Sequence, residues 1–246
     1  MGIFSAALVE QADPEIGHEI IRVRHDDGHV EELRLHDYER LYALPGVYEQ
    51  IVQERLGCRS PGELASMLAR AVDAAGWARA DVRVLDIAAG NGVSGEALAA
   101  ESLHPVLGTD IVPAARAAAL RDRPGVYGEY RTLDLLNLSD VERTSLRALG
   151  ASALSCVAPV GEHESELPPR ALLAAAGLLA ADALVVYMHD PHRGVPDPVT
   201  AELWKDGLGP GTRADEVQRR RYVHRTTVNG APFEMDGVVW RLRRSG

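Results

Sequence analysis

The sequence predicts an α/β protein: a three-layer sandwich on a mainly parallel seven-stranded sheet that ends in an antiparallel hairpin. From Val82 onward, strand-like runs alternate with helix-like runs of about ten residues, the pattern of parallel βαβ units. The last two strand-like runs instead flank Asn229-Gly230, a pair that favours tight hairpin turns. Five alternating strands and this hairpin together give the seven strands.

The individual elements follow from local patterns. Ser139 and Glu142 have the spacing of a capping box, which opens a helix. The apolar stretch 171–188 contains Asp182, so we expect a buried helix followed by a buried strand rather than a membrane span. The predicted strands are residues 82–87, 105–111, 126–135, 151–157, 182–188, 220–228 and 238–244, and the predicted helices are 92–101, 112–123, 139–149 and 168–179.

Residues 1–80 lack this alternation and are expected to form an N-terminal hairpin and helical cap before the domain of residues 81–246. Residues 20–35 alternate apolar and polar side chains on both sides of Asp27-Gly28, which predicts a hairpin. Residues 38–56 indicate two short helices broken at Pro45-Gly46. A further helix is predicted to start with Ser60 as its N-cap and to end at Gly76.

Composition excludes several classes of protein. A formal net charge of −10 argues against broad capture of a phosphate backbone, so nucleic acid is not the expected partner. Two cysteines make neither a disulfide framework nor a four-thiolate zinc site, and no metal is expected. The first residues have no basic region of a signal peptide, which favours a cytoplasmic protein. The sequence leaves open whether the protein forms a homodimer.

The strongest functional signal is a glycine turn after the first parallel strand. Gly90, Gly92 and Gly95 formally satisfy G-x-G-x-x-G, and Asp110 follows Gly90 by 20 residues, the spacing of a ribose-binding acid in a dinucleotide fold. Small residues there let a ligand approach backbone amides closely. Asp86 ends the first strand, where a dinucleotide-binding strand normally stays apolar.

Over residues 81–244 the sequence resembles the class I S-adenosylmethionine-dependent methyltransferases. The family's acid and three small residues match Asp86, Ala88, Gly90 and Gly92, with Ala88 in place of the usual first glycine. The resemblance implies that Asp110 accepts both ribose hydroxyls. It also implies that the cofactor is S-adenosylmethionine, with S-adenosylhomocysteine as product. The cap of residues 1–80 lies outside the region that resembles this family.

The same resemblance implies a set of cofactor contacts. The methionine part would lie at the Asp86 loop, and Asp134 would accept from the adenine amino group. Leu135 and Ile111 would cover the two faces of the adenine ring. The expected cofactor-binding residues are Asp86, Ala88, Gly90, Asn91, Gly92, Asp110, Ile111, Asp134, Leu135, Cys156 and Tyr42.

The acceptor side is expected at the carboxyl ends of the fourth and fifth strands. His163 follows the fourth strand and is the expected general base for a hydroxyl acceptor, with His189 after the fifth strand as second candidate. His189-Asp190-Pro191-His192 is interpreted as a proline turn rather than a metal site. Cys156 is interpreted as a small buried residue rather than a nucleophile.

Two rival functions stay open beside methyl transfer to a small molecule. An NAD(P)-dependent oxidoreductase would use the same glycines, although the chain has no Tyr-x-x-x-Lys pair. A non-catalytic module would keep the cofactor site without turnover. Seven arginines on the last hairpin are expected to face solvent, with a nucleic-acid or acidic-partner patch as the alternative; they are Arg219, Arg220, Arg221, Arg225, Arg241, Arg243 and Arg244.

Overall fold

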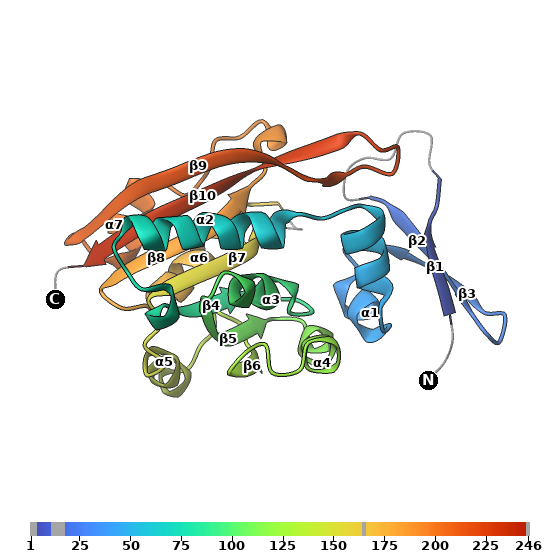
Figure 1. Cartoon of the computed structure of the whole chain (residues 1–246), viewed down its shortest axis with the longest axis horizontal. Helices are drawn as coiled ribbons and strands as arrows, with labels where there is room; N and C mark the ends of the chain where they lie inside the picture. Colours follow the sequence, from blue (N-terminus) through green and yellow to red (C-terminus); the bar gives the residue numbers. More distant parts are fainter. Residues whose placement is uncertain (1–3, 11–17, 164–165, 245–246) are drawn as a thin grey trace.

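The computed structural model describes residues 4–10, 18–163 and 166–244 and confirms the predicted α/β class (Figure 1). Its main sheet has the order β6-β5-β4-β7-β8-β10-β9. Strands β4 to β8 are parallel, and β10 pairs antiparallel with both β8 and β9. The strands are β4 (Arg83–Ile87), β5 (His104–Asp110), β6 (Glu129–Thr132), β7 (Ala153–Pro159), β8 (Asp182–His189), β9 (Thr212–Thr226) and β10 (Pro232–Arg244).

Helices cover both faces of this sheet and create two apolar layers. On one face, α2 and α3 contribute Leu68 and Leu98 to a core with Val84 and Val186. The opposite core joins α5, α6 and α7 to the other side of the same strands. The helices are α2 (Ser60–Ala74), α3 (Val93–Ala100), α4 (Pro113–Asp122), α5 (Asp140–Arg147), α6 (Pro169–Ala176) and α7 (Ala201–Leu208), with short 3-10 turns η2 (Arg79–Asp81) and η3 (Pro191–Arg193).

The N-terminal part forms a small unit with its own core. Strands β1 (Phe4–Leu8), β2 (Ile20–His25) and β3 (Val30–Arg34) make an antiparallel sheet, and the predicted turn at Asp27-Gly28 joins β2 to β3. Helix α1 (Tyr38–Ala43) and the π-helical segment η1 (Glu49–Arg55) pack against that sheet. Helix α1 also packs against α4, so this unit lies at the end of the molecule toward which β5 points (Figure 1).

Most local predictions are confirmed, including the capping box of Ser139 and Glu142 at the start of α5. The apolar stretch 171–188 divides into α6 and β8 as expected, and none of the helices among the described residues is long and apolar enough to cross a membrane. The third parallel strand is shorter than predicted, since β6 ends at Thr132. The sequence patterns did not predict α7.

The prediction that Ser60 is the N-cap of α2 is wrong. Ser60 lies inside the helix, and its hydroxyl bonds instead to the Tyr222 hydroxyl at 2.7 Å and to His224 Nδ1 at 2.6 Å. Both partners lie on β9, more than 160 residues away in the sequence. The hydroxyl therefore joins α2 to the C-terminal hairpin, and no local pattern could have indicated this contact.

Candidate functional site

The glycine turn after β4 adopts the backbone that a closely bound ligand requires. Gly90 and Gly92 have φ of +52° and +87°, in the left-handed region. Ala88, which replaces the family's usual glycine, also has a positive φ, of +50°. The turn therefore keeps a glycine-like backbone despite the substitution, and the alanine carries strain of about 1 kcal/mol or more.

Asp86 is fully buried beneath this turn. Its Oδ2 accepts hydrogen bonds from the hydroxyls of Ser94 at 2.5 Å and Tyr127 at 2.6 Å. Burial raises the pKa of Asp86 to about 6, although hydrogen bonds from the side chains of Ser94, Tyr127 and Ser155 oppose the rise. The Asp86 carboxyl is therefore held from three sides beneath the glycine turn.

The third glycine of the motif serves Tyr127 rather than a ligand. A Cβ on Gly95 would lie 2.5 Å from the Tyr127 ring, and one on Gly108 would lie 2.8 Å from the same ring. The Tyr127 hydroxyl accepts from the Gly95 N–H at 3.1 Å while it donates to Asp86. Gly95 thus provides space for a buried tyrosine that holds Asp86, which weakens the dinucleotide interpretation of the motif.

Asp86 should make folding stability depend on pH. Because its folded pKa of about 6 exceeds the ordinary 3.8, the protonated form stabilises the fold fully below pH 4, and this contribution is lost as the pH rises through 6. Relative to Asp86→Asn, the wild type should lose roughly 2 kcal/mol of unfolding free energy between pH 4 and pH 7. Urea denaturation at several pH values measures this loss. If the free energy of unfolding changed with pH in the same way for both proteins, the raised pKa of Asp86 would be contradicted.

Asp110 connects the end of β5 to the glycine turn. Its Oδ2 accepts from the Gly90 N–H at 3.0 Å, and its Oδ1 accepts from the Val112 N–H at 3.0 Å. Burial raises the pKa of Asp110, while these backbone hydrogen bonds lower it. Each carboxylate oxygen keeps a further lone pair, so the pair of ribose hydroxyls expected from the sequence fits these atoms chemically.

The predicted adenine contacts differ in their accessibility. Ile111 directly follows β5 and is 65% exposed, so its side chain is available to a ligand. Leu135 is buried in the core that α5 and α6 share. Asp134 lies two residues beyond β6, where it accepts from the Leu136 N–H and the Asn137 side-chain amide. These bonds lower the pKa of Asp134. Its role toward adenine stays a prediction.

The cap reaches the glycine turn through Tyr42. A Cβ on Gly90 would lie 2.5 Å from the Tyr42 hydroxyl oxygen, so only glycine leaves room for this contact. The Tyr42 ring is tilted against Tyr48 with centroids 5.0 Å apart, and Arg121 donates to the Tyr42 carbonyl at 3.3 Å. Tyr42 therefore lies at the glycine turn, and its contact with a cofactor stays a prediction.

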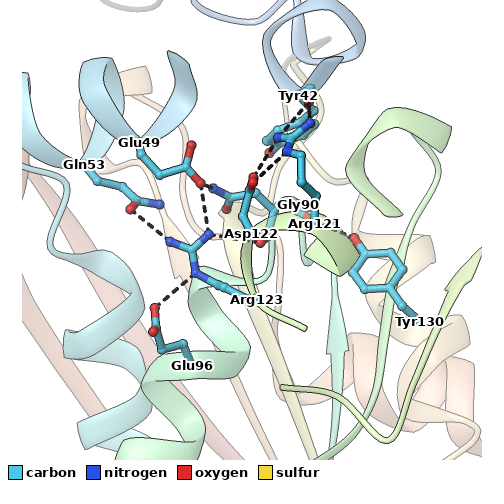
Figure 2. A network of polar contacts seen from close by, with 10 residues as sticks. Tyr42, Glu49, Gln53, Gly90, Glu96, Arg121, Asp122, Arg123 and Tyr130 are labelled. Carbon is cyan, nitrogen blue, oxygen red and sulfur yellow. Dashed lines mark hydrogen bonds and ion pairs between the residues drawn. The ribbon is translucent and has the colours of Figure 1, made fainter. Parts of the chain in front are cut away.

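A polar network centred on Arg123 fastens the cap to the turn (Figure 2). The guanidinium of Arg123 pairs with Glu49 at 3.0 Å and with Glu96 at 3.0 Å, and it donates to Gln53 at 3.3 Å. The side-chain amide of Asn91, a predicted cofactor-binding residue, donates to Glu49 at 2.6 Å. η1 is therefore linked to α3 and to the glycine turn by the same set of bonds.

The acceptor-side candidates lie at the predicted strand ends. Cys156 is buried on β7, and burial raises the pKa of its thiol to about 12, which agrees with a structural rather than a nucleophilic role. The exposed His163 follows β7, and its backbone N–H donates to Glu166. His189 is buried at the end of β8. Asp190 accepts from the His192 N–H, which confirms the proline turn.

The arginines of the C-terminal hairpin form ion pairs or hydrogen bonds within the protein. Arg225 contradicts the expectation of a solvent-facing row, since it is buried and pairs with Glu19 at 2.6 Å. Arg244 donates to the carbonyls of Leu179 and Ala180. The remaining ion pairs are Arg219–Asp197, Arg220–Glu63, Arg221–Asp236, Arg241–Asp182 and Arg243–Asp215.

Comparisons with known proteins agree with this geometry at the level of the fold. No family model and no curated protein matches the chain. Among solved structures, a proposed RNA methyltransferase of Pyrococcus horikoshii is 14% identical with a TM-score of 0.52, covering 77% of this chain and 87% of its own. An S-adenosylmethionine-dependent methyltransferase of Anabaena variabilis is 11% identical with a TM-score of 0.50, covering 87% and 96% respectively.

The chain has the class I methyltransferase fold. Within this methyltransferase fold, the acid at the end of β5 and the turn after β4 come together as the sequence predicted. Sequence reasoning missed Glu49, Arg123, Tyr127 and Tyr130, the last of which donates to the Gly90 carbonyl at 2.7 Å. These residues lie in segments without a recognisable motif, and only the fold shows that they contact the turn.

Proposed function

We propose that this protein is an enzyme that transfers a methyl group from S-adenosylmethionine to a small-molecule acceptor. The main support is the bridge from Asp110 to the Gly90 N–H, which sets a carboxylate with unused lone pairs beside a turn of left-handed backbone. A second carboxyl, that of Asp86, lies buried beneath the same turn. Both features suit a cofactor that carries a ribose diol and an ammonium group.

The residues have distinct roles in this proposal. When bound, the cofactor supplies a methyl carbon made electrophilic by a sulfonium. Asp110 holds the ribose hydroxyls, the turn of Ala88, Gly90 and Gly92 approaches the methionine part, and Tyr42 covers it from the cap. Ile111 and Asp134 contact the adenine. The protein's contribution is alignment of the acceptor, exclusion of water and removal of a proton where the acceptor carries one.

A small acceptor is favoured over a nucleic acid by two observations. Arg123 and its partners link the cap to the turn, and the buried Tyr42 of the cap lies against Gly90, so the cap covers this edge of the sheet. The hairpin arginines that could have bound phosphates pair with acidic side chains or backbone carbonyls. A nicotinamide cofactor is disfavoured because Gly95 accommodates Tyr127 and because the acidic Asp86 lies within β4, one residue before its end.

Thermal denaturation with candidate cofactors tests the proposal. S-adenosylhomocysteine at a hundredfold excess over its Kd should stabilise the protein by about 2.7 kcal/mol through mass action, and NADH or NADPH should not. Equal stabilisation by NADH would favour an oxidoreductase. Incubation of a cell extract with methyl-labelled cofactor should then place the label in the low-mass fraction, whereas label in the RNA fraction would contradict a small acceptor.

A further inference from the structure

A row of aromatic side chains runs from the glycine turn to a histidine of the cap. Tyr42 contacts Gly90, and Tyr38 stacks on Tyr42 with centroids 5.7 Å apart and an interplanar angle of 17°. His36 follows, with its Nδ1 2.9 Å from the Tyr38 hydroxyl oxygen and its ring edge-on to Tyr38. The row therefore connects the turn after β4 with a titratable group that the proposed function has not used.

His36 lies in the part of the cap that meets β9. The Leu35 N–H, next to His36, donates to the Glu19 carbonyl at 3.0 Å, and the Glu19 side chain pairs with Arg225 of β9 at 2.6 Å. Charged groups after β8 and at the end of β5 act electrostatically on the pair, Arg193 on His36 and Asp110 on Tyr38. The carboxyl ends of these strands are where an acceptor must meet the transferable methyl group.

The protonation states of His36 and Tyr38 suit His36 to act as a base rather than as an acid. His36 is exposed at the surface of the cap, and desolvation by the protein on the other side of its ring lowers its pKa. The charged and titratable groups that face it are Glu19, which raises this pKa, and Arg225, His18 and Arg193, which lower it. Burial raises the pKa of Tyr38 to about 12, so the tyrosine keeps its proton. At neutral pH the imidazole is therefore uncharged and able to accept a proton.

We propose that His36 is the catalytic base for a small, neutral hydroxyl acceptor and that Tyr38 is its positioning residue. This inference rests on the proposed function. The acceptor oxygen forms a bond to the methyl carbon, the carbon–sulfur bond breaks, and its electron pair neutralises the sulfonium sulfur. The hydroxyl proton moves to His36 Nε2. For this, the neutral ring carries its proton on Nδ1 and donates it to the Tyr38 oxygen.

A hydroxyl is the acceptor class for which this arrangement matters. A neutral alcohol or phenol keeps its proton near pH 7 and is a weak nucleophile until a base removes it. A neutral amine already presents a lone pair. Of the two histidines predicted from the sequence, His189 is buried at the end of β8, and His163 is exposed on the loop after β7. His36 is also exposed, and its Nδ1 contacts the Tyr38 hydroxyl of the aromatic row.

Nuclear magnetic resonance on the full chain saturated with S-adenosylhomocysteine tests the protonation state without turnover. Imidazole nitrogen shifts, assigned with His36→Asn, should give His36 a pKa below 6.5, with Nδ1 carrying the proton of the neutral ring. Tyr38→Phe should move that proton toward Nε2. Millimolar phenol, benzyl alcohol or cyclohexanol should shift the Nε2 resonance of His36. His104→Asn, at the amino end of β5, is the control and should leave all these results unchanged.

Methyl transfer to the hydroxyl probe that binds completes the test. His36→Asn should lower turnover roughly 10²- to 10⁴-fold with unchanged affinity for S-adenosylhomocysteine. Wild-type kcat/KM should rise with pH through the pKa of His36 and then level off, and Tyr38→Phe should lower kcat with KM unchanged. Absence of S-adenosylhomocysteine binding would overturn the proposed function itself. Intact binding combined with probe shifts at His163 or His189, or at no histidine, would overturn only the role of His36.

Discussion

Arg225→Ala should lower the free energy of unfolding by about 3–5 kcal/mol. The Arg225 guanidinium pairs with Glu19 at 2.6 Å, and the two side chains are 5% and 2% exposed. Arg225 also donates to the Thr226 carbonyl and lies 5.7 Å from the Phe233 ring centroid. Its removal leaves the Glu19 carboxylate buried without its cation, which explains the size of the effect.

Urea denaturation followed by circular dichroism measures this loss. Arg243→Ala is the matched control, because its pair with Asp215 is more than one-third exposed on both sides and should contribute less than about 1 kcal/mol. The double variant Glu19→Leu/Arg225→Leu should recover much of the loss, since it removes both charges together. A loss below 1 kcal/mol in the single variant would show that this ion pair does not hold the cap to β9.

Asp110→Asn should weaken S-adenosylhomocysteine binding by about 3 kcal/mol, or roughly a hundredfold, because two charge-assisted hydrogen bonds to the ribose lose their anionic acceptor. The structure adds a second consequence. Both oxygens of Asp110 already accept backbone N–H groups, so the amide nitrogen of asparagine would face one of these donors. We therefore also expect a loss of about 1–2 kcal/mol in folding stability.

Isothermal titration calorimetry, well below the melting temperature of the variant, separates binding from stability. Asp140→Asn is a suitable control because it changes an exposed carboxylate of the same size at the start of α5. Its affinity for S-adenosylhomocysteine should equal that of the wild type. If Asp110→Asn binds as tightly as the control, Asp110 has no part in the site, and the acid at the end of β5 would serve only to hold the Gly90 backbone.

The fold class and the glycine turn after β4 were predictable from the sequence because their signals are local. Strand–helix alternation, the Ser139 capping box and the Asn229-Gly230 turn each depend on residues a few positions apart. The pairing of Asp110 with the glycine turn also followed, since parallel strands bring their carboxyl ends to one edge. Helix α7, a short element of eight residues between β8 and β9, was not predicted from the sequence.

Only the tertiary structure decided the contacts between segments that are distant in the sequence. Ser60 has the sequence context of an N-cap, but burial against β9 gives its hydroxyl two other partners. Arg225 belongs to an alternating row, yet the cap covers it and supplies Glu19. Tyr127 and His36 carry no motif at all. A side chain's burial and its partners depend on which elements pack together. The sequence therefore determined the sheet and the glycine turn, whereas packing decided how the cap lies against them.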